Sequence, residues 1–174
     1  MIIEAEIIQQ PYSGQYTEQI YEIASPWNSQ EWTWIKFLSE DLNEWCGEFR
    51  GAPRDVAISK KHRTILVLTS DYLYQLNAIS GELIEYEEAH QYWCLTVTPG
   101  GDFIIADHYN IELIESSLSE KRDIKSPIQM DMVEFHGWTK NMLSIICDEF
   151  LNWNRHIRLE LDGETLEINV IEDL

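Results

Sequence analysis

Basic residues are scarce in this chain. The 174 residues include 12 lysines and arginines against 31 aspartates and glutamates, which gives a formal net charge of −19. A field of that sign repels the phosphates of nucleic acids and the anionic surface of membranes, so we expect neither as a partner. It attracts basic proteins and cations instead.

Cysteines are few, and long apolar runs are missing. Cys46, Cys94 and Cys147 are too far apart in the sequence to form a Cys-x-x-Cys pair, which argues against a disulfide framework or a zinc ribbon. No run approaches the roughly 18 apolar residues of a membrane-spanning helix. The segment Met1–Ile8 has no basic residue and is interrupted by acids, so we expect no signal peptide and a cytoplasmic location.

Motifs of catalysis and cofactor binding are missing as well. The sequence has no Gly-x-Ser-x-Gly turn, no His-Glu-x-x-His motif, no EF-hand loop and no glycine-rich phosphate loop. The histidines are scattered, and Cys94 and Cys147 lie in or beside apolar stretches, where a thiol is usually inert. We therefore expect no catalytic residue and no cofactor, and an enzyme is the less favoured class.

Short runs typical of β-strands dominate what is present. They are four to six residues long, rich in β-branched or aromatic side chains, and separated by turn residues. The first set comprises residues 56–59, 65–69, 72–77 and 83–86. In the third run, Tyr72, Tyr74 and Leu76 fall on one face at a period of two. The set predicts a four-stranded antiparallel meander.

The same order of runs recurs after 36 to 39 residues. The copies cover about residues 54–90, 93–127 and 130–168. A period near 40 residues with four strands per copy is typical of β-propeller blades. We therefore predict an all-β chain of successive antiparallel four-stranded meanders within a single domain, 1–174.

The tryptophan-rich residues 1–53 precede the copies. They could supply a fourth blade-like unit, and within them Ser39 could begin a helical turn, so we expect at most one short helix near residues 39–46. Closed propellers usually have about four to eight blades. Three clear copies therefore leave open a closed ring, an open stack of meanders or a sandwich.

Residues 56–70 follow the order inner strand, turn and second strand, and residues 77–83 form a turn before an outer strand. In this order of strands and turns, residues 54–168 resemble the blades of β-propellers of the tryptophan–aspartate-repeat and quinoprotein types. The resemblance implies a blade-like fold. It carries over no catalytic or cofactor residue, because the Gly-His and Trp-Asp dipeptides and the tryptophan docking motifs are absent.

Acidic residues recur where the second strand of each copy leads into the third. Asp71, Asp107 and Asp148 hold this position, with His108 and Glu149 beside two of them. Stacked repeats place equivalent turns on one rim, so these carboxylates could converge and hold Ca²⁺, which prefers oxygen ligands. The alternative is ordinary turn chemistry, in which Asp binds its own backbone, and this is the commoner case.

Aromatic residues beside turns are candidates for a binding surface. Trp93, Trp138 and Trp153 lie between predicted strands, and Tyr86 is flanked by glutamates. Trp and Tyr anchor many protein interfaces, whereas most aromatics of a β-rich domain belong to its core.

We therefore expect a non-catalytic, acidic protein-binding module whose partner is preferentially basic. One specific version is an immunity-type inhibitor of a basic protein. The alternatives are a small enzyme or sensor with a carboxylate and histidine site at the turn rim, and a structural subunit.

Overall fold

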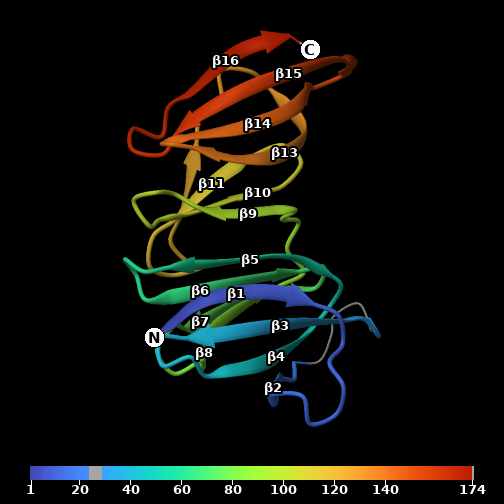
Figure 1. Cartoon of the computed structure of the whole chain (residues 1–174). Coiled ribbons are helices and arrows are strands. Elements are labelled where there is room, and N and C mark those ends of the chain that lie inside the picture. The colour runs from blue at the N-terminus through green and yellow to red at the C-terminus, as the bar shows by residue number, and fades with distance from the viewer. Residues whose placement is uncertain (24–28, 174) are drawn as a thin grey trace. The chain divides into compact units, whose positions relative to one another are not determined.

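The computed structural model describes residues 1–23 and 29–173, and these residues form strands and turns (Figure 1). They divide into two compact units: unit 1 is Met1–His90, and unit 2 begins at Gln91. Each unit contains two four-stranded sheets. Within the described residues there is no helix with the length and hydropathy needed to cross a membrane.

The second sheet of unit 1 is the meander that the sequence predicts. Its strands are β5 (Pro53–Ser59), β6 (Thr64–Thr69), β7 (Tyr72–Asn77) and β8 (Leu83–Glu88). Each strand pairs antiparallel with the next, in the order β5-β6-β7-β8. Both middle strands are buried along almost their whole length, which agrees with their runs of apolar and aromatic residues.

The first sheet of unit 1 is formed by residues that precede the three predicted copies. It has four strands, as the copies do, but it is not a simple meander. Its strands are β1 (Ile2–Ile8), β2 (Thr17–Tyr21), β3 (Trp32–Ser39) and β4 (Glu44–Arg50). Their order is β1-β3-β4-β2, and β2 lies parallel to β4 at the edge of the sheet. The sequence pattern did not predict this crossover.

The segment near residues 39–46 is a tight β-turn, so the helical turn considered for Ser39 does not form. Ser39 ends β3, and the amide of Leu42 donates to the carbonyl of Ser39 at 2.9 Å. Leu42 adopts a positive φ of 64°, which bends the chain back into β4. The alternating strands on both sides are half-buried or buried, so their pairing outweighs the local helix signal of the exposed acids.

The two sheets of unit 2 are both antiparallel meanders. The first contains β9 (Cys94–Val97), β10 (Phe103–Ala106), β11 (Ile111–Ile114) and β12 (Lys121–Ile124), and the second contains β13 (Met130–Thr139), β14 (Met142–Glu149), β15 (Asn152–Asp162) and β16 (Ile168–Asp173). Strands pair in chain order in each sheet. The all-β fold of four-stranded, blade-like sheets is therefore confirmed. The single-domain organisation stays a prediction.

Each unit has its own core. In unit 1 the core contains stacked rings, among them Tyr21 and Phe49, whose centroids are 4.5 Å apart. In unit 2 one aliphatic core cluster joins residues from both sheets, such as Ile111 and Leu113 from the first and Ile145 and Leu159 from the second. This cluster fixes the two sheets of unit 2 against each other, and it forms the floor of the site described next.

Candidate functional site

Four rings form a continuous surface on unit 2, which we call the aromatic surface: Trp93, His108, Tyr109 and Phe150. The ring centroids are 5.6 Å apart for Trp93 and His108, and 6.0 Å apart for Tyr109 and Phe150. Trp93, Tyr109 and Phe150 are 50%, 51% and 40% exposed, respectively. Neighbouring rings that are about half exposed form an apolar patch of a kind that protein partners cover.

Backbone hydrogen bonds set the positions of these rings. Asp107 forms an Asx turn, in which its Oδ1 accepts from the amides of Tyr109 and Asn110, both at 2.6 Å. The amide of Trp93 donates to the carbonyl of Ala106 at 2.7 Å, just before β9. The amide of Phe150 donates to the carbonyl of Gln129 at 2.9 Å, which ties the β14–β15 turn to the start of β13.

Two apolar residues near these rings have strained backbone conformations. Met132, in a bulge of β13, has a φ of 52° and is 51% exposed, and Leu151, next to Phe150, has a φ of 64° and is 78% exposed. A positive φ is unfavourable for large side chains, and such residues cluster at functional sites. The bulge also brings the amide of Val133 to the carbonyl of His108, at 3.3 Å. Both strained residues therefore present apolar side chains to solvent beside the aromatic surface.

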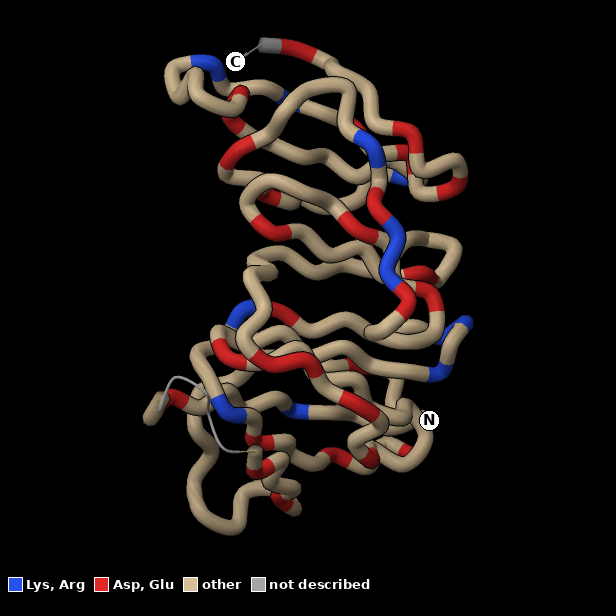
Figure 2. The backbone as a smooth tube through the Cα atoms, turned by 180° about the vertical axis from the view of Figure 1, so that it is seen from behind, with Lys and Arg blue, Asp and Glu red and all other residues tan. Residues whose placement is uncertain are grey.

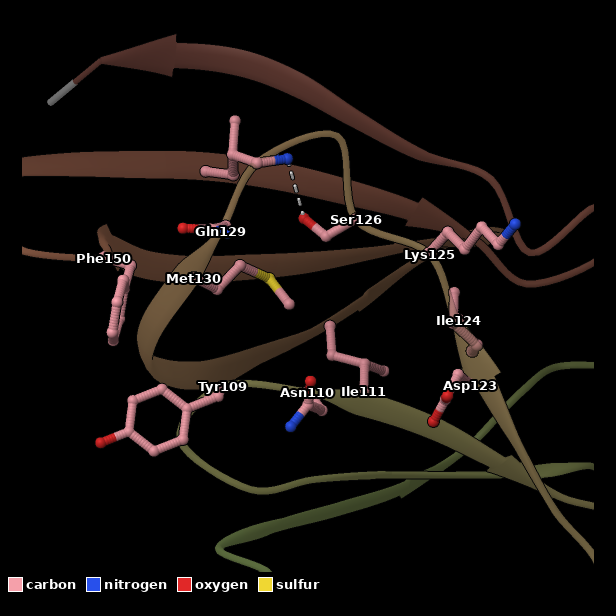
Figure 3. A pocket seen from close by; sticks show the side chains of 11 residues that line it. Tyr109, Asn110, Ile111, Asp123, Ile124, Lys125, Ser126, Gln129, Met130 and Phe150 are labelled. Carbon is pink, nitrogen blue, oxygen red and sulfur yellow. Dashed lines mark hydrogen bonds between the residues drawn. The ribbon is translucent and has the colours of Figure 1, made fainter.

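A cavity of about 680 Å³ opens next to the aromatic surface, between the two sheets of unit 2 (Figure 3). Its apolar floor is formed by Ile111, Ile124 and Met130, which all belong to the core cluster. Tyr109 and Phe150 line one end of it, and Figure 3 shows Asp123 and Lys125 at the other. The volume lies within the roughly 300–1,000 Å³ range of ligand-binding pockets.

The surroundings of the aromatic surface are acidic. Unit 2 holds 16 aspartates and glutamates against 6 lysines and arginines, and red segments outnumber blue ones along its backbone in Figure 2. Asp131 and Asp148 face each other across β13 and β14, an arrangement that is repulsive. Asp148 is 2.5 Å from Nδ1 of His156, and the indole N–H of Trp153 donates to Asp131 at 3.2 Å. The predicted site residues Asp148 and Trp153 thus lie at the border of this surface.

Glu149 lies at the same border. Its carboxylate accepts a hydrogen bond from the guanidinium of Arg155 at 2.8 Å and from the side-chain amide of Asn152 at 3.0 Å. These contacts hold the carboxylate beside the β14–β15 turn that carries Phe150. Glu149 therefore supports the turn at the same time as it adds a negative charge.

The three rim aspartates are each engaged by neighbouring groups. Asp107 forms the Asx turn, Asp148 contacts His156, and Asp71 is buried in unit 1, where its Oδ1 accepts from the Ser70 hydroxyl at 2.7 Å. Among the described residues, no group of three or more His, Cys, Asp or Glu side chains is arranged to hold a metal ion. The contacts of Asp107 are those of turn chemistry, whereas Asp148 and Asp71 contact neighbouring side chains.

Two other predicted site residues lie away from the aromatic surface. Trp138 packs on the core cluster of unit 2, its indole N–H donates to Thr96 at 2.9 Å, and a Cβ on Gly163 would come within 2.8 Å of its ring. Tyr86 lies in β8 of unit 1, where its half-exposed ring meets the buried ring of Tyr72 edge-on at 5.7 Å. Trp138 therefore packs partly against the core of unit 2, and Tyr86 presents one side to solvent.

Burial keeps two of the thiols protonated. It raises the pKa of Cys46 and that of Cys147 to about 11, so both are almost entirely protonated near neutral pH. Cys94 is half-buried, and its thiol donates to the carbonyl of Val133 at 3.5 Å. These environments are those of small apolar residues rather than of nucleophiles.

Sequence reasoning missed the cavity and the bulge at Met132. Ile111, Ile124 and Met130 belong to apolar runs, and nothing in such a run distinguishes a cavity floor from ordinary core. Asp107 next to His108 and Tyr109 was a usable signal, because an Asp-led turn followed by rings presents those rings at the end of a sheet.

No protein-family model matches the sequence, and comparison with curated proteins finds no significant match. Solved structures do resemble the chain. The dihydro-heme d1 dehydrogenase NirN, in complex with DHE, has a propeller-like fold and aligns over 81% of this chain and 32% of its own, with 16% identity and a TM-score of 0.52. A protein of unknown function from Bacteroides caccae aligns over 82% of this chain and 59% of its own, with 14% identity and a TM-score of 0.51.

The N-terminal domain of Nup159 from S. cerevisiae has a lower TM-score of 0.47, with 12% identity over 71% of this chain and 34% of its own. The chain thus spans between about a third and three-fifths of the length of these three structures. At these identities, the two neighbours with the higher scores establish the blade-like fold and nothing further.

Proposed function

We propose that this chain is a non-catalytic, cytoplasmic protein-binding module, and that the aromatic surface of unit 2 binds a basic partner. The observation that carries the proposal is the row of rings, Trp93, His108, Tyr109 and Phe150, three of which are about half exposed, beside an open cavity with an apolar floor. Aromatic side chains are enriched at the energetic centres of protein interfaces. The strained, exposed Met132 and Leu151 extend the same apolar area.

The preference for a basic partner follows from charge. A net charge of −19 steers positively charged proteins towards the chain and repels acidic ones, and salt weakens this effect. Near the rings, Asp131 and Asp148 add two facing carboxylates. In the narrower form of the proposal, binding blocks the activity of the basic partner, as an immunity-type inhibitor does.

The test compares capture by the wild type with capture by a triple variant, Trp93→Ala, Tyr109→Ala and Phe150→Ala. Each immobilised protein is incubated with an extract of its own cells at about 50 mM and about 500 mM salt, across which screening changes strongly. We expect the wild type to retain basic proteins at low salt and the triple variant to lose them. Tyr12→Ala is the matched control, because Tyr12 is 86% exposed but lies in unit 1.

Equal retention by the wild type and the triple variant would overturn the proposal, and so would a retained set that is not basic. A retained enzyme permits the second step, in which purified chain is added at increasing ratios to that enzyme. Inhibition that saturates at a fixed stoichiometry is expected for the inhibitor form, and undiminished activity in the saturated complex contradicts that form alone.

A further inference from the structure

The cavity of unit 2 has apolar and aromatic walls. Its floor consists of the core residues Ile111, Ile124 and Met130, and Figure 3 shows the side chains of Ile111 and Met130 pointing toward each other. Tyr109 and Phe150 line one end, with their rings edge-on and their centroids 6.0 Å apart. Aromatic rings favour edge-to-face and offset contacts with one another, so these two can pack against a third ring. The floor and the rings therefore favour a ligand with an apolar, aromatic body.

Three uncharged polar side chains of the cavity lining have hydrogen-bonding capacity left: Asn110, Ser126 and Gln129. The side-chain nitrogen of Asn110 donates to Asp107 at 3.3 Å, but its Oδ1 accepts no hydrogen bond within the described residues. The hydroxyl of Ser126 accepts from the amide of Ile128 at 3.3 Å and can still donate its own proton. The side chain of Gln129 forms no hydrogen bond in the part of the chain that the structure describes. These groups favour an amide or a hydroxyl group on the ligand.

The charges around the cavity disfavour ions of either sign. Asp123 and Lys125 both line the cavity, so a charged ligand meets a like charge in the lining. Lys121 and Arg122 lie on the same strand, β12, and oppose a cation as well. Unit 2 as a whole holds 16 aspartates and glutamates against 6 lysines and arginines, which opposes an anion. An uncharged ligand avoids both repulsions.

We propose that the cavity of unit 2 binds a small, uncharged molecule that carries an aromatic ring and an amide or hydroxyl group. The volume of about 680 Å³ suits such a molecule, since ligand pockets of roughly 300–1,000 Å³ enclose small molecules on apolar walls with a few polar groups. The inference goes beyond the proposed function, because the ligand is a small molecule and its polar group binds outside the aromatic surface. Tyr109 and Phe150 belong to both sites.

The experiment uses the full chain with isotopically labelled methionine methyl groups, and phenylacetamide as the probe. In NMR spectra, the methyl signal of Met130 reports on the cavity floor, and that of Met142, which does not line the cavity, is the control. We expect phenylacetamide to shift the Met130 signal until it saturates and to leave the Met142 signal unchanged. The titration gives the Kd of the probe.

Three analogues of the probe test the chemistry of the ligand. Phenylacetate is an anion, phenethylamine is a cation, and cyclohexylacetamide is uncharged but lacks the aromatic ring. We expect each charged analogue to bind at least threefold more weakly than phenylacetamide, because each meets a like charge in the lining. Cyclohexylacetamide should bind at least twofold more weakly, because it loses the ring contacts with Tyr109 and Phe150.

Two variants test the effect of charge, and each is the control for the other. Asp123→Asn should strengthen the binding of phenylacetate by roughly threefold, and Lys125→Gln should do the same for phenethylamine, which is the effect of removing one exposed like charge. Neither variant should change the Kd of phenylacetamide by more than twofold. Both side chains are exposed, so we expect retained melting temperatures, which confirm that the variants fold.

Three results would overturn the inference: no shift of the Met130 signal at the solubility limit of phenylacetamide, equal affinity for phenylacetamide and any of the analogues, and an unchanged charge preference in both variants. Failure here is distinguishable from failure of the proposed function. If Met130 does not shift while basic proteins are still captured through Trp93, Tyr109 and Phe150, the small-molecule site is wrong and the module stands. If Met130 shifts but capture does not depend on those rings, the aromatic surface is wrong and the small-molecule site stands.

Discussion

The core of unit 1 is rich in aromatic rings, whereas the core cluster of unit 2 is aliphatic and several rings of unit 2 lie at its surface. Unit 1 buries four rings completely: Phe37, Phe49, Tyr72 and Tyr74. Unit 2 buries one ring completely, that of Phe103. Its core cluster consists of aliphatic residues, Met130 and Cys147, and the rings of Trp93, Tyr109 and Phe150 are about half exposed. Aromatic rings thus make up more of the core in unit 1, whereas three rings of unit 2 remain available to a partner.

This difference shows why aromatic content alone does not assign a binding surface. Burying a ring removes a large apolar area from water and stabilises the fold, whereas leaving it half exposed forgoes part of that gain. Unit 2 leaves several rings about half exposed along one surface and so gains less stability from them. Met132 and Leu151, near these rings, also have strained backbones. Four substitution experiments test whether the two units divide these roles.

The largest contrast is expected between Phe49→Ala and Phe150→Ala. Phe49 is fully buried, with its centroid 4.5 Å from that of Tyr21 and 5.1 Å from that of Tyr74, so its truncation should cost about 3–5 kcal/mol. Phe150 is 40% exposed, and its truncation should cost less than about 1 kcal/mol. Urea denaturation followed by circular dichroism measures both free energies. Similar losses would mean that Phe150 is a core residue after all.

A second contrast lies within unit 2, between Trp138→Ala and Trp93→Ala. Trp138 packs beside Gly163 and donates to Thr96, so its loss should cost about 2–3 kcal/mol. Trp93 is half exposed, and we expect a cost below about 1 kcal/mol. The same denaturation experiment applies. Capture of basic proteins should follow the opposite order, with Trp93→Ala the more damaging change.

The sequence predicts those features of the fold that produce a local pattern of residue types. Period-two alternation and turn residues predicted the strands of β5–β8 and the blade-like repeats, because burial on one face of a strand leaves a direct mark on the sequence. No local sequence pattern indicates the parallel pairing of β2 with β4, since the choice of a partner strand depends on contacts between distant residues. The hairpin after Ser39 was mistaken for a possible helix because its acids suit both conformations.

The candidate site was predictable only in part, for the same reason. Trp93, Trp153, Asp107 and His108 could be named because polar turns next to rings are visible in the sequence. Trp138 also lies between predicted strands, as Trp93 and Trp153 do. The absence of a side chain at Gly163 nevertheless allows the ring of Trp138 to pack inward. The facing pair Glu112 and Asp123 required the register of β11 and β12, which no local pattern supplies.

A pH effect is expected from His90 of unit 1. Burial lowers the pKa of His90 below its ordinary value of 6.5, so the folded state favours the neutral ring. Below about pH 6.5 the unfolded state binds the proton more readily, and the free energy of unfolding therefore falls as the pH falls from 6.5 to the lowered pKa. The slope should not exceed about 1.4 kcal/mol per pH unit. Denaturation of the wild type and His90→Asn between pH 7.5 and 5.0 measures it, and an unchanged slope in the variant would contradict the assignment.

The smallest effect, and one of opposite sign, is expected for Glu112→Gln. Removing one of two carboxylates that face each other across β11 and β12 relieves repulsion, so unit 2 should gain a few tenths of a kcal/mol of stability. Glu115→Gln, which removes an exposed acid just after β11, should leave the free energy of unfolding within that margin of the wild type. Paired thermal denaturation at low salt, where the repulsion is least screened, gives the best resolution. A destabilised Glu112→Gln would contradict the repulsion and show that this carboxylate stabilises the fold.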